Sequence, residues 1–357
     1  MRANQNIPNC WPTTATQHNE PYWLRLNRLR ALFSTFRQPH QGWMPCHQAT
    51  WSPLNSTLAQ MSAALAARVH ADSSPGPAQS QWLLHWCQQE GVPIVHILQQ
   101  LQTRDYSEVH HQTANTLAQA GLQKASLEHL ETLSLKPFQL PGVNAKTALA
   151  LIQQCWLACQ PSAAIWLQQL IAAQRLCITT EGDDMAWCLD TPFGAYVRVD
   201  YQPDFTHLMT LMHELGHAYH QDWHRAESSR PLRYIEKETA ALKAEQQLLL
   251  WLTQQPPPYP EAVKHYWQYQ YFEMHTRQWL LSQFEFDLYR LQTFTPSHIS
   301  SLWCAHLHRY YGPQIELDAD DAEAWAELPE LLTAPFYRLS YPLAYARSLA
   351  SVLGTKP

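Results

Sequence analysis

The chain has 357 residues, of which 46% are apolar, so it can bury a large core, and disorder as its main state is excluded. Charged residues make up only 15%, and the net charge of −6 argues against nucleic acid or an anionic membrane surface as the main partner. With only 10 glycines, the composition favours helices over a turn-rich all-β chain.

The first residues, the longest apolar stretches and the cysteines of the sequence bear on the cellular compartment. The first residues, Met1 to Pro8, have no apolar run behind their basic residue, and no stretch reaches about 18 uninterrupted apolar residues. Neither a secretory signal nor a membrane helix is therefore expected. The eight cysteines are too scattered for a compact disulfide framework, and Cys155 and Cys159 are interpreted as buried thiols rather than metal ligands. These features favour the reducing cytoplasm.

The first half of the chain is predicted to be helical, because its apolar residues recur at helical spacing. Residues 1–20 are expected to form a loose N-terminal arm, and residues 21–178 a helical N-terminal region. Proline-containing stretches at 73–77 and 137–143 separate the predicted helices. No motif in this half carries chemistry by itself, so its expected role is to support or wall a site elsewhere.

The pattern changes near residue 180, where turn-forming residues precede a β-rich alternating segment. This segment, Ala195–Tyr201, is predicted to be a strand. Pro203 and Asp204 then open a long helix that reaches at least His220. Further helices are predicted over about 234–253, 260–291, 296–311 and 336–353. The fold class expected from these elements is mainly α, with one small β-sheet.

The middle of this long helix contains the pattern His-Glu-x-x-His, in the residues His213-Glu214-Leu215-Gly216-His217. A spacing of four puts His213 and His217 on one helix face, where both imidazoles can bind a single ion such as zinc. Glu214 lies about 100° round the helix, placed to act on a water at the same metal. Because the chain is rich in histidine, the pattern alone can arise by chance. Its position within a helix that follows a strand supports the metal hypothesis.

A catalytic zinc site needs a third protein ligand and an open fourth position. Two acids on the next predicted helix, Glu236 and Glu238, are candidates, but they lie two positions apart and only one can face the metal. Glu238 is predicted to be the ligand, because the small residues after it allow close helix packing. Glu236 is interpreted as a solvated acid. Glu245 is either an acceptor for a ligand imidazole N–H or another solvated acid.

Further motifs accompany this pattern in a fixed order between about residues 183 and 350. They are Cys188-Leu189-Asp190-Thr191-Pro192, the string Thr210 to His220, Glu238-Thr239-Ala240 with Glu245, Arg277-Gln278 with Phe284-Glu285, Tyr310-Tyr311-Gly312-Pro313, Trp325 to Pro329, and Phe336-Tyr337 with Tyr341. This half of the chain resembles oligoendopeptidase F and its thimet-oligopeptidase-like relatives. The first half is assigned by default as a shortened version of the family's helical amino-terminal part.

The resemblance implies a zincin-type helical metallopeptidase with one Zn²⁺ ion per chain and with residues 179–357 as the catalytic domain. It also implies an endopeptidase that cleaves short unfolded peptides in a deep channel. The chemistry of the residues agrees, since Glu214 would act as general base on zinc-bound water and pass the proton to the leaving amine. The partner expected is therefore a short peptide substrate, and neither nucleic acid nor membrane.

The substrate would need contacts besides the metal. The strand Ala195–Tyr201 is expected to pair with the peptide backbone as a sheet edge does, with Tyr196, Val197 and Arg198 as substrate-binding residues. Main-chain hydrogen bonds of this kind would give cleavage that tolerates many sequences.

The oxyanion donors of the family are only partly present. In relatives a His and several tyrosines of the carboxy-terminal segment stabilise the oxyanion, whereas here Glu330, Leu332 and Leu339 replace three of them. Tyr337 and Tyr341 remain as candidate catalytic donors. Losing one donor typically costs about 10²–10³ in rate, so turnover is expected to be slow, narrowly specific or served by a different donor.

Three functions remain open from the sequence. The first is the zinc oligopeptidase. The second is a metallopeptidase-like protein that binds a peptide or partner with little or no turnover, as the altered Glu330 region favours. The third is a zinc-dependent enzyme that modifies a non-peptide substrate. The intact Glu214 favours an enzyme, because a protein that only binds has no need of a general base.

Overall fold

The computed structural model describes residues 78–354, except 135–137, 181–185, 192, 229, 292–293 and 329. The predicted N-terminal arm and the predicted helices before residue 78 lie outside the described residues. All described residues belong to the second of two units along the chain, Ser56–Pro357. The domain boundary at residues 178–179 stays a prediction.

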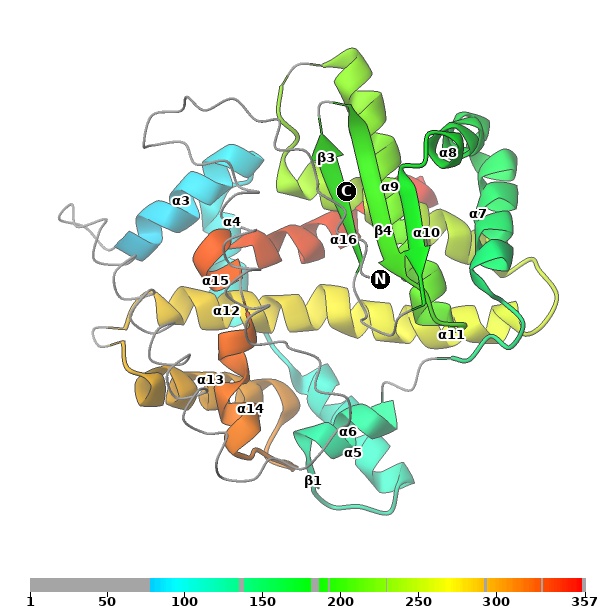
Figure 1. Cartoon of the computed structure of the whole chain (residues 1–357). Helices are drawn as coiled ribbons and strands as arrows, with labels where there is room; N and C mark the ends of the chain where they lie inside the picture. The colour runs from blue at the N-terminus through cyan, green and yellow to red at the C-terminus, as the bar shows by residue number, and fades with distance from the viewer. Residues whose placement is uncertain are drawn as a thin grey trace, which may run out of the picture. The chain divides into compact units, whose positions relative to one another are not determined.

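The second unit is mainly helical, as expected (Figure 1). Before the sheet lie α3 (Ala78–Glu90), α4 (Ile94–Thr103), α5 (Ser107–Gln119), α6 (Leu127–Ser134), α7 (Ala145–Cys159) and α8 (Pro161–Ala172). After the sheet lie α9 (Phe205–Glu227), α10 (Tyr234–Leu252), α11 (Tyr259–Gln270), α12 (Gln278–Leu288), α13 (Pro296–Tyr311), α14 (Ala319–Glu323), α15 (Glu330–Thr333) and α16 (Ser340–Leu353). The π-helical segment η2 (Tyr271–Arg277) joins α11 to α12, and the 3₁₀ turns are η3 (Ala324–Glu327) and η4 (Tyr337–Leu339).

A three-stranded sheet in the order β2-β4-β3 lies beside these helices. Its strands are β2 (Leu176–Thr179), β3 (Ala186–Thr191) and β4 (Gly194–Asp200), and β4 runs parallel to β2 and antiparallel to β3. Elsewhere in the described chain β1 (Ala125–Ser126) pairs in parallel with β5 (Ile315–Glu316). The prediction of a mainly α-helical fold with a small sheet beside the long motif helix is confirmed.

The expectation that the strand Ala195–Tyr201 offers its edge to a peptide is wrong. This strand is β4, and it is central, so its backbone groups already pair with β2 and β3. Val197 is 1% exposed and contributes to the core, whereas Tyr196 on the opposite face is 38% exposed. β3 lies at one edge of the sheet, and within the described residues its outer side has no strand partner.

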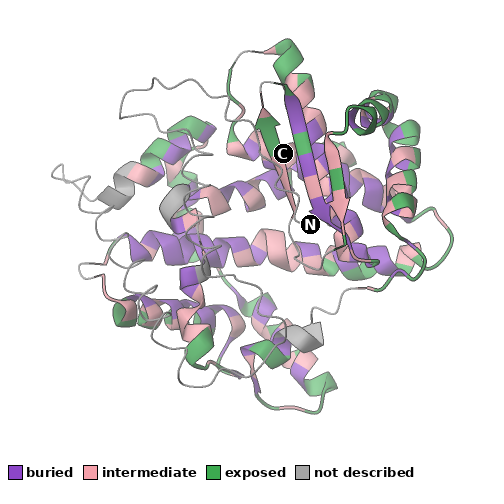
Figure 2. Ribbon diagram, viewed as in Figure 1, coloured by how far each residue is buried: buried purple, intermediate pink, exposed green. Residues whose placement is uncertain are grey.

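The motif helix α9 forms because its apolar residues recur every three or four positions and because Asp204 caps it. The Asp204 carboxylate accepts a hydrogen bond from the His207 backbone N–H at 2.8 Å. α9 packs against β3, β4 and α10, and α16 packs against α10. Buried residues run along β4 and almost all of α12 (Figure 2).

None of the helices in the described part of the chain combines the length and the apolar composition that crossing a bilayer requires.

Candidate metal centre

The two imidazoles of the His-Glu-x-x-His pattern lie on one face of α9, with ring centroids 4.6 Å apart. Glu238, from α10, faces both of them. Its Oε2 lies 3.5 Å from His213 Nε2 and 3.6 Å from His217 Nε2. The candidate ligand atoms of the three residues all lie within 4.8 Å of one another. The structure therefore brings together the three residues predicted as metal ligands.

The close approach of α9 and α10 depends on Gly216. A Cβ added at Gly216 would lie 2.9 Å from the Ala241 Cα and 2.9 Å from the Ala244 Cβ. Contacts this short do not occur between real side chains and backbone, so only glycine fits between the two helices. The glycine on α9 and the small residues on α10 thus let the Glu238 carboxylate reach the imidazoles.

The environment of Glu238 fits a divalent cation. The side chain is 3% exposed, and its Oε1 accepts a hydrogen bond of 2.6 Å from the Tyr337 hydroxyl. Its Oε2 is buried and has no hydrogen-bond partner within the described residues. A buried carboxylate oxygen without a partner is costly unless a cation satisfies it. Two imidazole nitrogens and one carboxylate oxygen are also the donor set that zinc accepts.

Glu245 orients one of the imidazoles. Its Oε1 lies 2.6 Å from His213 Nδ1, and its Oε2 accepts hydrogen bonds from the Tyr266 hydroxyl at 3.1 Å and the Gln270 amide at 2.6 Å. The side chain is 3% exposed, which excludes the alternative of a solvated helix acid. A carboxylate at Nδ1 leaves Nε2 as the nitrogen that points to Glu238.

The other acid, Glu236, has a different role. Its carboxylate forms an ion pair of 2.8 Å with Arg230 and accepts a hydrogen bond from the Arg233 backbone N–H at the start of α10. It is partly exposed and is not one of the three residues whose ligand atoms converge.

Burial and local charges give these groups different proton affinities in the metal-free chain. Burial lowers the pKa of His217 to about 4. Burial acts in the same direction on His213, but the two nearby carboxylates, Glu238 and the hydrogen-bonded Glu245, outweigh it and raise the pKa of His213 well above 6.5. For Glu238 burial is outweighed by the histidines and Tyr337, and its pKa falls to about 2.

Glu214 lies on the side of α9 that faces β3. Burial, and after it the charge of Glu214, raises the pKa of the Cys188 thiol on β3. The Cys188 thiol donates to Gln221 of α9 at 3.4 Å, and Gln221 follows Glu214 by seven residues, so both lie on the same side of the helix. The pKa of Glu214 itself is raised to about 7, mainly by burial. A carboxyl group with a pKa near 7 is suited to accept and return a proton at neutral pH.

Tyr337 and Tyr341 lie at the Glu238 side of the group. The Tyr337 hydroxyl donates to Glu238, and the Tyr341 oxygen is 3.1 Å from the Tyr337 oxygen. Burial raises the pKa of both hydroxyls above its ordinary value. Both tyrosines therefore stay protonated near neutral pH and can donate hydrogen bonds.

A buried acid to which the sequence assigned no role, Glu285, positions Tyr337. Phe336 has a left-handed backbone (φ 60°), which is unfavourable for a bulky residue. Its backbone N–H donates to Glu285 Oε1 at 2.9 Å, and the Tyr289 hydroxyl donates to the same oxygen at 2.6 Å. The Phe284-Glu285 pair was one of the motifs that carry the resemblance, but only the fold shows that Glu285 accepts a hydrogen bond from the turn before Tyr337.

At three positions where the resemblance implies oxyanion donors, this chain has other residues, namely Glu330, Leu332 and Leu339. Glu330 Oε2 accepts a hydrogen bond of 3.1 Å from Arg338, whose other nitrogen lies 3.4 Å from Gln278 Oε1. Leu339 is fully buried in the core. The side chain of Leu332 lies outside the described part of the structure. Where the resemblance leads one to expect a histidine, this chain thus has an ion pair.

Comparison with known proteins gives matches in structure alone: no family model and no curated protein matches the chain. A solved structure assigned as an oligoendopeptidase F matches 93% of this chain and 60% of its own length, with a TM-score of 0.60 and 14% identity. PZ peptidase A with an inhibitor matches 92% and 60%, with a TM-score of 0.59 and 15% identity. A structure assigned as a peptidase from Chlamydophila abortus matches 84% and 53%, with a TM-score of 0.53 and 17% identity.

The chain has the fold of the oligoendopeptidase F-type peptidases. This confirms the fold that the motifs implied. The chain spans 53–60% of the length of these oligoendopeptidase-type structures, so it is similar to a part of each.

The contact at Gly216 gives a first prediction for this candidate metal site. Gly216→Val is expected to destabilise the protein by about 1–3 kcal/mol, because the new side chain has no room between α9 and α10. It is also expected to weaken zinc binding, because Glu238 moves away with α10. Urea unfolding and zinc titration measure the two effects, with Ala226→Val at the exposed end of α9 as the control. Unchanged stability and unchanged zinc affinity would contradict the assigned role of Gly216.

Proposed function

We propose that the protein is a zinc-dependent endopeptidase that hydrolyses short unfolded peptides. The observation that carries the proposal is the buried Glu238 oxygen without a partner, which faces the Nε2 atoms of His213 and His217. The fold of the oligoendopeptidase-type peptidases supports it. The peptide substrate and the cytoplasmic location are part of this proposal.

His213, His217 and Glu238 would hold the zinc ion, and Glu245 would keep the His213 ring in its orientation. When bound, the ion supplies Lewis acidity, which polarises the scissile carbonyl and acidifies water. Glu214 would accept the proton of the attacking water and deliver it to the leaving amine. Glu214 follows the ligand His213 directly in the sequence and lies on the side of α9 that faces β3.

Two further parts of the site would bind the substrate. The Tyr341 hydroxyl would donate to the developing oxyanion, and Tyr337, whose single O–H proton is donated to Glu238, would do so only by giving up that hydrogen bond. The outer edge of β3 would pair with the extended peptide, in place of β4 as first expected, because within the described residues this edge has no strand partner and β3 packs against α9. Affinity would then come largely from main-chain hydrogen bonds.

The proposal is tested with the purified full chain and a mixture of internally quenched peptides of 6–12 residues, a length range of about one to three strand lengths. Zinc-loaded protein is expected to cleave internal bonds, chelation by a strong zinc chelator should stop cleavage, and added zinc should restore it. Mass spectrometry of the fragments identifies the bond. If fully zinc-loaded protein binds peptides without cleaving them, the result would instead support the second candidate function, a metallopeptidase-like protein that only binds. The ion pair of Glu330 with Arg338, at a position where the resemblance implies a catalytic histidine, favours this alternative.

Zinc binding is expected to release about one proton from His213 near pH 7. Because the pKa of His213 is raised well above 6.5, the ring is protonated in the metal-free chain, and Nε2 must lose its proton before it binds the ion. Zinc affinity should therefore rise about tenfold per pH unit below the pKa of His213. Calorimetry in buffers with different ionisation enthalpies measures the release. Glu245→Gln, which removes one cause of the raised pKa, should reduce it, and equal release by both proteins would contradict the prediction.

A further inference from the structure

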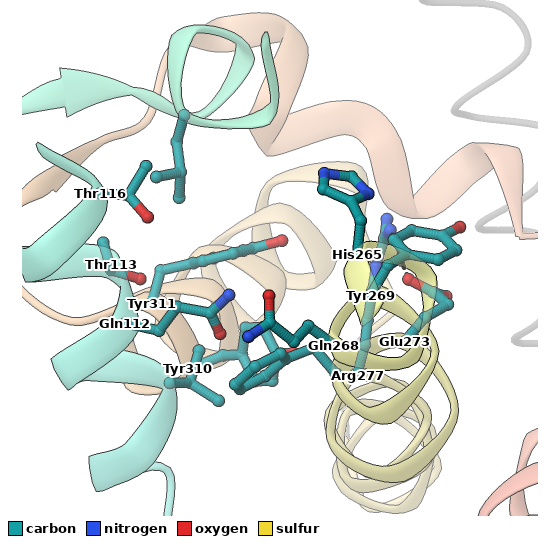
Figure 3. Close-up of a pocket in the computed structure, with 13 residues that line it drawn as sticks. Gln112, Thr113, Thr116, His265, Gln268, Tyr269, Glu273, Arg277, Tyr310 and Tyr311 are labelled. Carbon is teal, nitrogen blue, oxygen red and sulfur yellow. Dashed lines mark hydrogen bonds and ion pairs between the residues drawn. The ribbon is translucent and has the colours of Figure 1, made fainter. Parts of the chain in front are cut away.

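A cavity of about 130 Å³ lies between α5 and the helix formed by α11 and η2, apart from the metal ligands (Figure 3). Tyr310 and Tyr311, at the end of α13, also line it. Apolar cavities of about 150 Å³ are large enough to hold a benzene ring. The cavity is therefore of the size that one ring-bearing side chain fills.

The lining of this cavity suits an uncharged ring. Six of the thirteen lining residues are apolar or aromatic, and they are Val109, Leu130, Tyr269, Phe272, Tyr310 and Tyr311. The two charged residues of the lining, Glu273 and Arg277, form an ion pair with each other at 3.2 Å. A charged guest would have to compete with this pair, whereas an aromatic guest can contact the tyrosine rings edge to face.

Two amide side chains add a feature suited to a peptide. Gln112 from α5 and Gln268 from α11 point into the same space in Figure 3. An amide group offers both donors and an acceptor, which matches the main-chain groups on either side of a guest residue. Thr116 of α5 is also on the lining.

Short contacts connect the cavity to the candidate metal centre. The Tyr269 ring, in the cavity wall, lies 5.7 Å from the Tyr266 ring, and the Tyr266 hydroxyl donates to Glu245, which holds His213. The π-helical segment η2 supplies Phe272, Glu273 and Arg277 to the lining. π-helical turns are often found at functional sites, because they shift the side chains that follow.

We propose that this cavity is a substrate subsite that takes the side chain of a phenylalanine or tyrosine in the peptide, at a position several residues from the cleaved bond. The inference deepens the proposed peptidase function and rests on it. An extended peptide advances about 3.3 Å per residue, so the aromatic residue and the scissile bond must keep a fixed separation along the sequence.

The test uses quenched eight-residue peptides of alanine and serine, in which one phenylalanine is moved through every position. With the zinc-loaded full chain, phenylalanine at one fixed distance from the cleaved bond is expected to raise kcat/KM by about 10- to 100-fold over the peptide without it. Thr116→Phe, which fills the cavity from α5, should remove this preference and leave cleavage of the phenylalanine-free peptide unchanged. Asn115→Phe, on the exposed side of the same helix, is the matched control and should keep it.

Binding separates failure of the subsite from failure of the proposed function. Fluorescence anisotropy of labelled peptides with Glu214→Gln protein should show the same preference for phenylalanine and its loss in the Thr116→Phe background. Preference in binding without any cleavage by the parent chain would keep the subsite and overturn the peptidase. Cleavage without a positional preference, or a preference that survives Thr116→Phe, overturns the subsite. Gln112→Phe is a second filling variant if Thr116→Phe does not fold.

Discussion

Glu214→Gln is expected to lower kcat by about 10²–10⁴-fold, the usual contribution of a general acid–base group. Glutamine has nearly the same shape as glutamate but cannot accept the proton of the attacking water. Zinc content should stay the same, because Glu214 is not one of the three residues whose ligand atoms converge. Steady-state cleavage of a quenched peptide and metal analysis of the same sample measure both quantities.

The control for this variant is Glu227→Gln, which makes the same chemical change at the last residue of α9, far along the helix from the ligands. It should cleave at the parent rate. If Glu214→Gln turned over peptide as fast as the parent chain, the general base would have to be another group, and the proposed mechanism would fail.

Glu238→Ala is expected to lower zinc affinity by more than 100-fold. Changes to residues that only support metal ligands typically cost 10- to 100-fold, and loss of a ligand removes a direct bond as well. The two remaining imidazoles would hold the ion with one protein bond fewer than a catalytic zinc site needs. Competition with a chromogenic chelator measures the affinity, and the zinc-induced rise in Tm should disappear.

Glu236→Ala is the matched control for this variant, because it removes an acid of the same helix that pairs with Arg230. Its zinc affinity should equal that of the parent chain. Stoichiometric, tightly bound zinc in Glu238→Ala would show that Glu238 is not the third ligand and that a different carboxylate binds the ion.

The sequence predicted that His213, His217 and Glu238 converge, because the geometry of such a group follows largely from local rules. A spacing of four on a helix fixes the relation of His213 to His217, and the small residues after Glu238 indicate close packing with the preceding helix. The structure adds why the packing is possible, since Gly216 leaves the space that Ala241 and Ala244 occupy.

The sheet was predicted less well, because strand order depends on contacts between distant segments. Alternation in Ala195–Tyr201 indicated a strand with one buried face, but it carries no information on which neighbours pair with its edges. β2 and β3 have weaker patterns, and without them the central strand was mistaken for an edge. Glu285 was missed for the same reason, since its contact with Phe336 spans 51 residues of sequence.

The free outer edge of β3 has a consequence for handling the protein in solution. Within the described residues this edge has no strand partner, and an edge strand can pair with the same strand of a second molecule, so self-association through β3 is expected at high concentration. Asp190, near the end of β3, is paired with Arg225 of α9, and a charge fixed there disfavours continuous pairing between two copies. Asp190→Ala would remove this charge, so we expect it to favour β3–β3 pairing between molecules and to lower the solubility of the protein.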